Sequence, residues 1–306
     1  METWHSEYLD LMFGKNRTSE TMDKAARLKY QHMPETVFKY RSFNNNSISA
    51  LKEDCLFSSS PKWLNDIREA PISFVSDKIK ASVVQDVYND ARKHDPRLPE
   101  AVVRNEYELA AVFRALSGNP GFPEPQNDAF INELVAWCNK VYDALLGGHI
   151  GNLRNMYNVC CFSASGTEDL MWSHYADSHK GFCIEYDFKS LGITNEDVQL
   201  LLPVVYIDTP HIQMDDLDAA DGSLLMYAMS LKRSSWGYEQ EWRRFYPHTD
   251  EPNPEKMPNP VGLYLGTRCS DQNKEQMMEI CKDKEIPLFQ MTLKSFGSTI
   301  TPERIL

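Results

Sequence analysis

Two glutamates separated by one residue, Glu239 and Glu241, have the spacing in this chain that is most typical of a chemical site. The residues around them predict a β-strand over residues 238–246. Alternate residues of a strand point to one face, about 7 Å apart, so we expect both carboxylates and Arg243 on the same side. One carboxylate can then orient a hydroxyl while the other stabilises a developing positive charge or accepts a proton. A solvated strand face with Glu–Arg ion pairs is the alternative.

A second group of polar and aromatic residues lies in the middle of the chain. Ser163 ends a predicted buried strand, and residues 167–175 predict a short helix that carries Trp172, His174 and Tyr175. Histidine changes its charge near neutral pH, and tyrosine offers a flat face to a ring. A hydrogen-bonded aromatic corner explains the same residues without any chemistry.

Arg41 is the candidate for binding an anion. It ends a strand predicted over residues 36–41. A guanidinium at that position can hold a diphosphate or a carboxylate with two hydrogen bonds, whereas the alternative is a surface ion pair. His174 and His179 are five residues apart rather than the four of a helical zinc pair, which argues against a zinc site. A hard-metal site that includes Asp177 and Glu185 is an open alternative, and we assign no metal ligand.

The elements that must position these residues predict an α+β fold with a mixed, largely antiparallel sheet. Residues 75–155 carry apolar side chains at helical spacing and no cluster of ligand-type residues. We therefore expect them to form a helical insertion within a single domain that comprises residues 1–306. Further strands are predicted over residues 181–187, 201–207, 261–265 and 286–293.

The composition excludes several classes of protein. The chain has 306 residues and a net charge of −12, which argues against binding along a nucleic-acid backbone but is compatible with a local basic pocket. Seven cysteines without a C-x-x-C pair indicate reduced core thiols and a cytoplasmic location. No apolar run approaches the roughly 20 residues of a membrane helix, so we expect no membrane association. The motifs of P-loop NTPases, classical dinucleotide folds and α/β-hydrolases are missing from the sequence.

Seven segments follow one another in an order typical of one protein family, within a match that extends from residue 37 to about residue 300. They are residues 38–42, 57–66, 161–163, 171–176, 180–186, 236–243 and 264–266. In this order they resemble the bacterial domain of unknown function 2971 family, with the helical block as its variable middle. The family name implies no activity.

A second resemblance is to the Arg-Ser-Glu type of mono-ADP-ribosyltransferases. Arg41, residues 163–165 and residues 239–241 follow the order of that family's strand-borne arginine, serine strand and Glu-x-Glu strand. The resemblance implies an ADP-ribosyltransferase-like fold and an enzyme that uses NAD as a substrate to modify a macromolecular acceptor, either protein or nucleic acid. The middle motif here is Phe-Ser-Ala-Ser rather than Ser-Thr-Ser, and a long segment separates it from the third motif.

The resemblance also implies a role for each matching residue. Arg41 would hold the diphosphate of NAD, and Ser163 would support the nicotinamide ribose. Tyr175 would stack on the nicotinamide. Glu241 would bind the ribose 2′-hydroxyl and stabilise the oxocarbenium-like transition state, while Glu239 would orient the acceptor. We place Trp172 with the cofactor-binding residues and His174 with the catalytic ones.

Two other functions stay open at this point. One is a metal-dependent nuclease or phosphodiesterase that uses Glu239, Glu241 and His174. The other is a non-enzymatic module that senses a nucleotide or a phage protein through the same polar pocket. For the transferase, the family resemblance suggests a toxin or an effector of antiphage defence. The sequence defines neither the acceptor nor the oligomeric state.

Overall fold

The computed structural model describes residues 3–14, 16–65, 72–73, 77–94, 96–105, 107–109, 111–112, 132–133, 136–140, 143–144, 155–208, 212–213, 223–249, 254–294 and 300–306. The chain divides into two compact units. Unit 1 comprises Met1–Ala70, Asn155–Pro210 and Leu225–Leu306, and unit 2 comprises Pro71–Arg154 and His211–Leu224.

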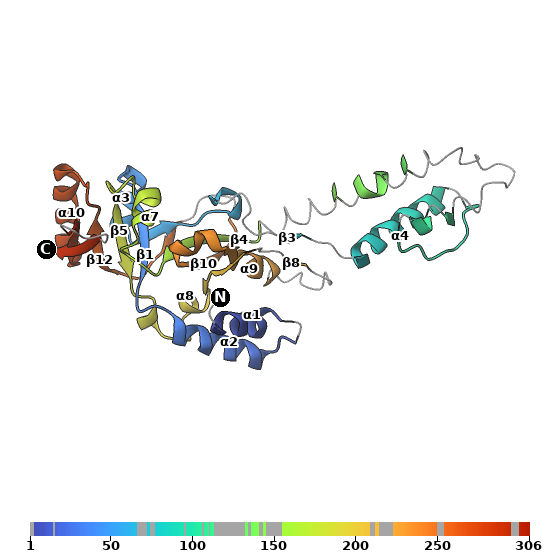
Figure 1. Ribbon diagram of the computed structural model, residues 1–306, viewed down its shortest axis with the longest axis horizontal. Helices are drawn as coiled ribbons and strands as arrows, with labels where there is room; N and C mark the ends of the chain where they lie inside the picture. The colour runs from blue at the N-terminus through green and yellow to red at the C-terminus, as the bar shows by residue number, and fades with distance from the viewer. Residues whose placement is uncertain are drawn as a thin grey trace. The chain divides into compact units, whose positions relative to one another are not determined.

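Unit 1 is built on a large open sheet (Figure 1). Among the described residues eight strands form it, in the order β14 (Ile300–Arg304), β13 (Leu288–Leu293), β12 (Pro260–Leu265), β5 (Phe182–Tyr186), β1 (Val37–Arg41), β4 (Tyr157–Ser163), β10 (Glu241–Pro247) and β6 (Leu201–Pro203). Neighbouring strands are antiparallel except β12 and β13, which are parallel. The predicted α+β class with a largely antiparallel sheet is therefore confirmed.

Shorter strands pair outside this sheet. In unit 1, β2 (Cys55–Phe57) pairs antiparallel with β11 (Pro254–Lys256), and β7 (Val205–Ile207) pairs parallel with β9 (Leu231–Arg233). In unit 2, β3 (Ile72–Ser73) pairs parallel with β8 (Ile212–Gln213).

Several helices begin where the sequence supplies a polar cap. Thr18 and Thr21 form a capping box at the start of α2, and the Asn44 and Ser270 side chains accept hydrogen bonds from backbone N–H groups at the starts of α3 and α10. The described helices are α1 (Thr3–Phe13), α2 (Ser19–His32), α3 (Asn45–Lys52), η1 (Pro61–Trp63), α4 (Asp77–His94), α7 (Asp169–Tyr175), η2 (Lys189–Leu191), α8 (Glu196–Gln199), α9 (Ser223–Met229), η3 (Ser234–Glu239) and α10 (Asp271–Lys284). No helix among the described residues combines the length and the hydrophobicity needed to cross a membrane.

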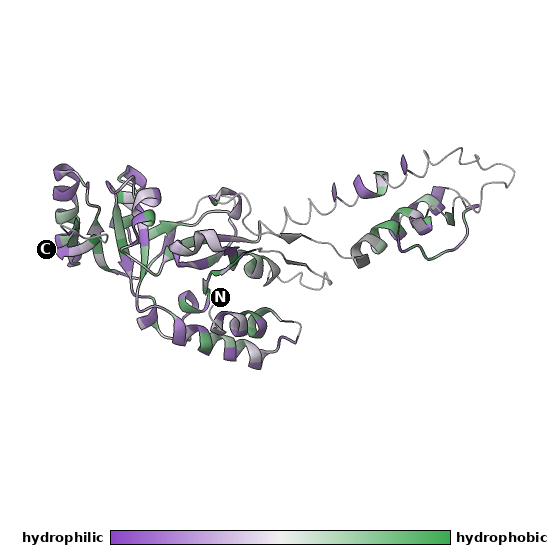
Figure 2. Ribbon diagram, in the orientation of Figure 1, coloured by the Kyte–Doolittle hydropathy of each residue, from purple (hydrophilic) through white to green (hydrophobic). Residues whose placement is uncertain are grey.

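Helix α7 packs on the sheet through its apolar face. Met171 and Trp172 join Tyr40 of β1 and Cys183 of β5 in one buried cluster, and the indole of Trp172 meets the Tyr40 ring edge to face, 5.2 Å between centroids. Figure 2 shows the hydrophobic residues gathered on the central strands, while α10 carries both kinds of residue. This packing fixes α7 over β1 and β5.

The turn from α7 into β5 is tight. Asp177, Ser178 and His179 all have positive φ, at 47°, 53° and 67°. Gly181 then passes so close to the main chain of β1 that a Cβ would lie 2.2 Å from the Arg41 carbonyl oxygen. Only glycine fits there without moving the backbone, which explains the glycine in this motif.

The predicted helical insertion over residues 75–155 falls mainly in unit 2, and much of it lies outside the described residues. Helix α4 occupies its first part. Tyr88 of α4 is fully buried, together with Leu98, Val103 and Leu109, in a cluster within this unit.

Candidate functional site

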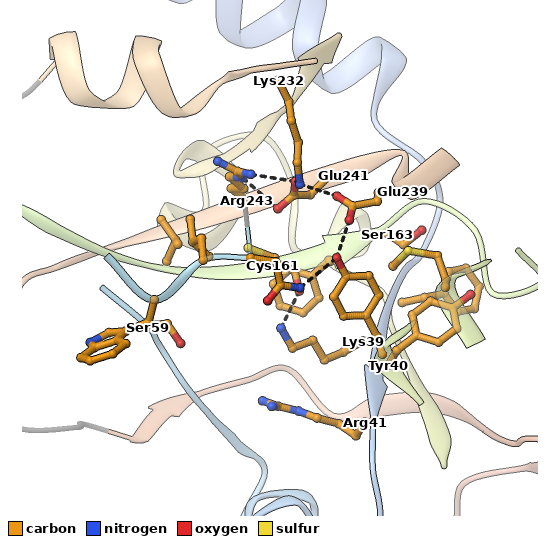
Figure 3. Close-up of a pocket in the computed structure, with 18 of the residues that line it drawn as sticks. Lys39, Tyr40, Arg41, Ser59, Cys161, Ser163, Lys232, Glu239, Glu241 and Arg243 are labelled. Carbon is orange, nitrogen blue, oxygen red and sulfur yellow. Dashed lines mark hydrogen bonds and ion pairs between the residues drawn. The ribbon is translucent and has the colours of Figure 1, made fainter. Parts of the chain in front are cut away.

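Unit 1 contains a cavity of about 220 Å³ beside the middle of the large sheet (Figure 3). Strands β1, β4 and β10 contribute to its wall, together with η1, α7, β9 and η3. The charged side chains that line it are Lys39, Arg41, Lys232, Glu239, Glu241 and Arg243.

Most of the residues expected at a site meet in this cavity. Arg41, Ser163, Tyr175, Glu239 and Glu241 all line it, although they lie on separate elements. Strand pairing explains part of this convergence, because Ser163 of β4 faces Glu241 of β10 on one side and Phe38 of β1 on the other.

Trp172 and His174 do not line the cavity. Trp172 is fully buried in the core beneath α7, and its indole nitrogen donates to the Gly166 carbonyl at 2.9 Å. His174 is exposed on the same helix, with its ring near those of Tyr175 and Tyr238. The structure therefore places Trp172 as a packing residue and His174 on the surface.

The two glutamates do not share a strand face, and the prediction of a strand from residue 238 is wrong at its start. Glu239 is the last residue of the 3-10 helix η3, and β10 begins at Glu241. Gln240 between them is left-handed, with φ of 44°, an uncommon conformation for a residue other than glycine. Its carbonyl accepts a hydrogen bond of 2.9 Å from the Ala164 N–H.

This turn directs both carboxylates onto one lysine. The Lys232 Nζ lies 2.5 Å from Glu239 Oε2 and 3.0 Å from Glu241 Oε2. All three side chains are at least 94% buried, with exposures of 4% to 6%. Figure 3 shows Lys232 reaching between the two carboxylates. Since an unpaired buried charge is costly, the three groups depend on each other.

Arg243 fixes Glu241 from a second direction. Its Nε and Nη2 donate to Oε1 and Oε2 of Glu241, both at 2.8 Å, and its Nη1 donates to the Met229 carbonyl at 2.8 Å. This two-pronged geometry is the strongest kind of arginine–carboxylate pair. The Tyr206 hydroxyl accepts from the Glu241 N–H at 2.8 Å and anchors the main chain as well.

Tyr175 connects Glu239 to the mouth of the cavity. Its hydroxyl donates to Glu239 Oε1 at 2.5 Å and accepts from Asn65 Nδ2 at 3.1 Å. These two bonds hold the phenol ring in the cavity wall.

Lys39 and Arg41 bring two more cations from β1, on the side of the cavity opposite Lys232 (Figure 3). Lys39 Nζ donates to the Cys161 carbonyl at 2.7 Å. The Arg41 Nε is buried and has no hydrogen-bond partner among the described residues. The charged lining thus holds four basic side chains and two acidic ones, in a chain whose net charge is −12. Burial and the neighbouring charge of Arg41 lower the pKa of Lys39.

The environment moves the pKa values of the two carboxyls in opposite directions. Burial and the neighbouring charge of Glu241 raise the pKa of Glu239, against the opposing effects of Lys232 and Tyr175. Burial also acts to raise the pKa of Glu241, but Arg243 and Lys232 outweigh it and hold that pKa well below the ordinary value. Two carboxyls separated in this way can take different roles, one permanently ionised and one able to accept a proton.

Comparison with known proteins adds a family match at this site. Residues 171–244 match a family described as protein of unknown function (DUF2971). The DUF2971 segment includes Tyr175 and the cluster of charged residues formed by Lys232, Glu239, Glu241 and Arg243. The match therefore supports the resemblance to that family over this part of the chain. No curated protein and no solved structure matches the chain.

Sequence reasoning missed several members of the site, and Lys232 is the most important. Lys232 lies in β9, three residues that carry no motif, and meets the glutamates only because η3 turns back over it. Lys39 lies two residues before Arg41 on the same strand, but no motif around it indicates a site residue. The one available signal for Lys232 was its place inside the DUF2971 segment.

The lowered pKa of Glu241 predicts a loss of stability in acid. A carboxyl whose folded pKa lies below its unfolded value stabilises the fold above the unfolded value, near 4.5, and this contribution is lost as the pH falls through the folded pKa. We therefore expect the free energy of unfolding to fall more steeply in the wild type than in Glu241→Gln between about pH 5 and pH 2. Urea denaturation across this pH range measures the two slopes.

The matched control for the acid experiment is Glu275→Gln, since Glu275 is exposed on α10. Its slope should equal that of the wild type. The raised pKa of Glu239 acts in the opposite sense, because it favours the protonated carboxyl and weakens the fold as the pH rises above 4.5. Equal slopes for the wild type and Glu241→Gln below pH 4.5 would contradict the assignment of an ionised Glu241.

Proposed function

We propose that the chain is an ADP-ribosyltransferase-like enzyme that cleaves NAD and transfers its ADP-ribose to a macromolecular acceptor. The observation that carries this proposal is the convergence of Arg41, Ser163, Tyr175 and Glu241 on one cavity, from four separate elements. These are the residues to which the Arg-Ser-Glu resemblance gives roles on a single NAD molecule.

The charges of the cavity suit the diphosphate of NAD. Arg41 and Lys39 lie on one strand with their cationic groups in the lining, and the partnerless Nε of Arg41 has a donor to offer to a phosphate oxygen. A guanidinium and an ammonium together suit a dianion.

The two carboxyls suit the two halves of the transfer. When the bond between nicotinamide and ribose breaks, nicotinamide leaves with the bonding electron pair and positive charge develops on the ribose. The ionised Glu241, fixed by Arg243 and Lys232, would stabilise that charge. The acceptor then bonds to the ribose carbon and loses a proton, which Glu239 would take because its pKa is raised.

The test of the proposal is the release of nicotinamide from NAD by the purified chain. Replacing Arg41 by methionine is expected to raise KM for NAD by about 10- to 100-fold, because a hydrogen bond to a charged group contributes roughly 1.5–3 kcal/mol. Transfer of labelled ADP-ribose to protein or nucleic acid of a cell lysate identifies the acceptor class. Arg268→Met, an exposed arginine outside the cavity lining, is the matched control.

Failure of the wild type to release nicotinamide or to label any acceptor would overturn the proposal. One observation favours a second candidate, a nucleotide-binding module without turnover, because both carboxylates are already engaged by buried cations. NAD binding by calorimetry without nicotinamide release would support that module. For a working transferase, the cellular role that we propose is that of a toxin or of an effector of antiphage defence.

A further inference from the structure

Two exposed aromatic rings stand at the cavity. Among the described residues of unit 1, Phe57 and Trp63 are the large aromatic side chains that are exposed, at 41% and 81%, and both line the cavity. Elsewhere in this unit the described aromatic residues are buried or half-buried. Exposed aromatic surface gathered at one cavity of a folded unit is typical of a binding site.

Backbone hydrogen bonds order the main chain that carries both rings. Trp63 ends the 3-10 helix η1, whose N–H to carbonyl bond from Trp63 to Ser60 measures 3.0 Å. Just before η1, Ser59 forms two backbone hydrogen bonds of 2.9 Å with Val159 of β4. Phe57 is the last residue of β2 and pairs with β11. The main chain that carries the rings is therefore already ordered, so a ligand has only the side-chain rotamers left to fix.

The same cavity combines these rings with free cationic capacity. Arg41, with its partnerless Nε, and Lys39 line it together with Trp63. A phosphate alone would use the cations and leave the rings exposed, and an apolar ligand would do the reverse. A nucleotide carries both a flat aromatic base and a phosphate within one small molecule, and base–aromatic stacking is favourable for any base.

We propose that Trp63 is the stacking platform for the nucleobase of the ligand, with Phe57 as a second ring of the lining and the phosphates at Arg41 and Lys39. This inference rests on the proposed function and deepens it, because it assigns the adenine end of NAD to η1 and β2. It also gives the cavity a ligand class, phosphorylated nucleosides, that does not depend on turnover.

The test uses ADP and inorganic pyrophosphate, neither of which carries the nicotinamide bond. By isothermal titration calorimetry, the wild type is expected to bind ADP more tightly than pyrophosphate. Trp63→Ala should weaken ADP binding by about tenfold or more and leave pyrophosphate binding unchanged, since only the stacking contact is lost. Trp63→Phe should retain most of the affinity, and Arg41→Met should weaken both ligands.

Trp137→Ala, which removes a half-exposed tryptophan of unit 2, is the matched control and should bind both ligands as the wild type does. Because Trp63 is so exposed, its replacement should leave the thermal unfolding midpoint unchanged. The inference is overturned if Trp63→Ala binds ADP as tightly as the wild type, if pyrophosphate binds as tightly as ADP, or if ADP does not bind.

These outcomes separate the inference from the proposed function. Trp63-dependent ADP binding by a chain that never cleaves NAD supports the nucleobase platform and removes the transferase. If the chain cleaves NAD but Trp63→Ala leaves its ADP affinity unchanged, the result supports the transferase and removes the nucleobase platform.

Discussion

Replacing Glu241 by glutamine is expected to slow nicotinamide release from NAD by about 100- to 1,000-fold, with little change in KM. The reason is that glutamine keeps the shape of the side chain but removes the negative charge that, in the proposed reaction, would face the developing oxocarbenium. The effect should be large because Glu241 is buried and fixed by three hydrogen bonds from Arg243 and Lys232. Single-turnover measurement of nicotinamide by chromatography gives the rate of the chemical step.

Glu275→Gln, an exposed carboxylate on α10, is the matched control and should turn over NAD as the wild type does. The substitution leaves the buried Arg243 facing a neutral side chain, whereas Lys232 keeps its ion pair with Glu239. The circular dichroism spectrum of Glu241→Gln is therefore compared with that of the wild type to show that the variant is folded. A folded Glu241→Gln variant with unchanged turnover would remove Glu241 from the chemistry.

Replacing Arg243 by methionine is expected to lower the free energy of unfolding by about 3–5 kcal/mol. Arg243 is 1% exposed, and its loss leaves Glu241 with Lys232 as the remaining cation among its recorded partners. It also removes the donor to the Met229 carbonyl, which ties the end of α9 to β10. Urea denaturation at neutral pH measures the change.

The double variant Glu241→Met, Arg243→Met separates the cost of an unpaired charge from the value of the pair. It removes both partners and keeps the ion pair between Lys232 and Glu239. We expect the double variant to be more stable than Arg243→Met alone, because it has no buried Glu241 carboxylate that has lost the Arg243 guanidinium. Arg268→Met should not differ from the wild type. A loss below about 1 kcal/mol in Arg243→Met would mean that the cluster contributes no more than a surface ion pair.

The positions of some strands could be predicted from the local sequence, because the pattern that marks each of them lies within the strand itself. The alternation of residues 36–41 predicted β1, and the apolar run before Ser163 predicted β4. Once β1 and β4 are placed as neighbours in the sheet, Arg41 and Ser163 can line the same cavity. Periodicity carries that kind of information because a strand with one buried face must alternate.

The turn at Gln240 could not be predicted in the same way. Residues 238–246 have the composition of a strand, but the structure ends the 3-10 helix η3 at Glu239 and starts β10 two residues later. The contacts that stabilise this break come from Ala164 and Tyr206, which are distant in sequence. Tertiary contacts outweigh local propensity at such places.

Helix α7 shows a second limit of sequence reasoning. Trp172, His174 and Tyr175 lie within one turn of the chain, yet one is in the core, one is exposed and one lines the cavity. On a helix, residues three apart, such as Trp172 and Tyr175, lie closer to the same side than residues two apart, such as Trp172 and His174. Which side of α7 faces the core depends on how the helix lies over β1. That placement comes from packing around Tyr40.

The boundary between η3 and β10 separates two ways of holding a carboxylate. Glu241 belongs to a seven-residue strand that is paired on both sides, by β4 and by β6, so the position of its main chain is set by the sheet. Glu239 ends the 3-10 helix η3, and its side chain is held by Lys232 and Tyr175. Because Lys232 also contacts Glu241, a displacement of Glu239 would change the partners of both carboxylates together. An acceptor that contacts Glu239 would therefore also alter the environment of the carboxylate that we propose for the stabilisation of the ribose charge.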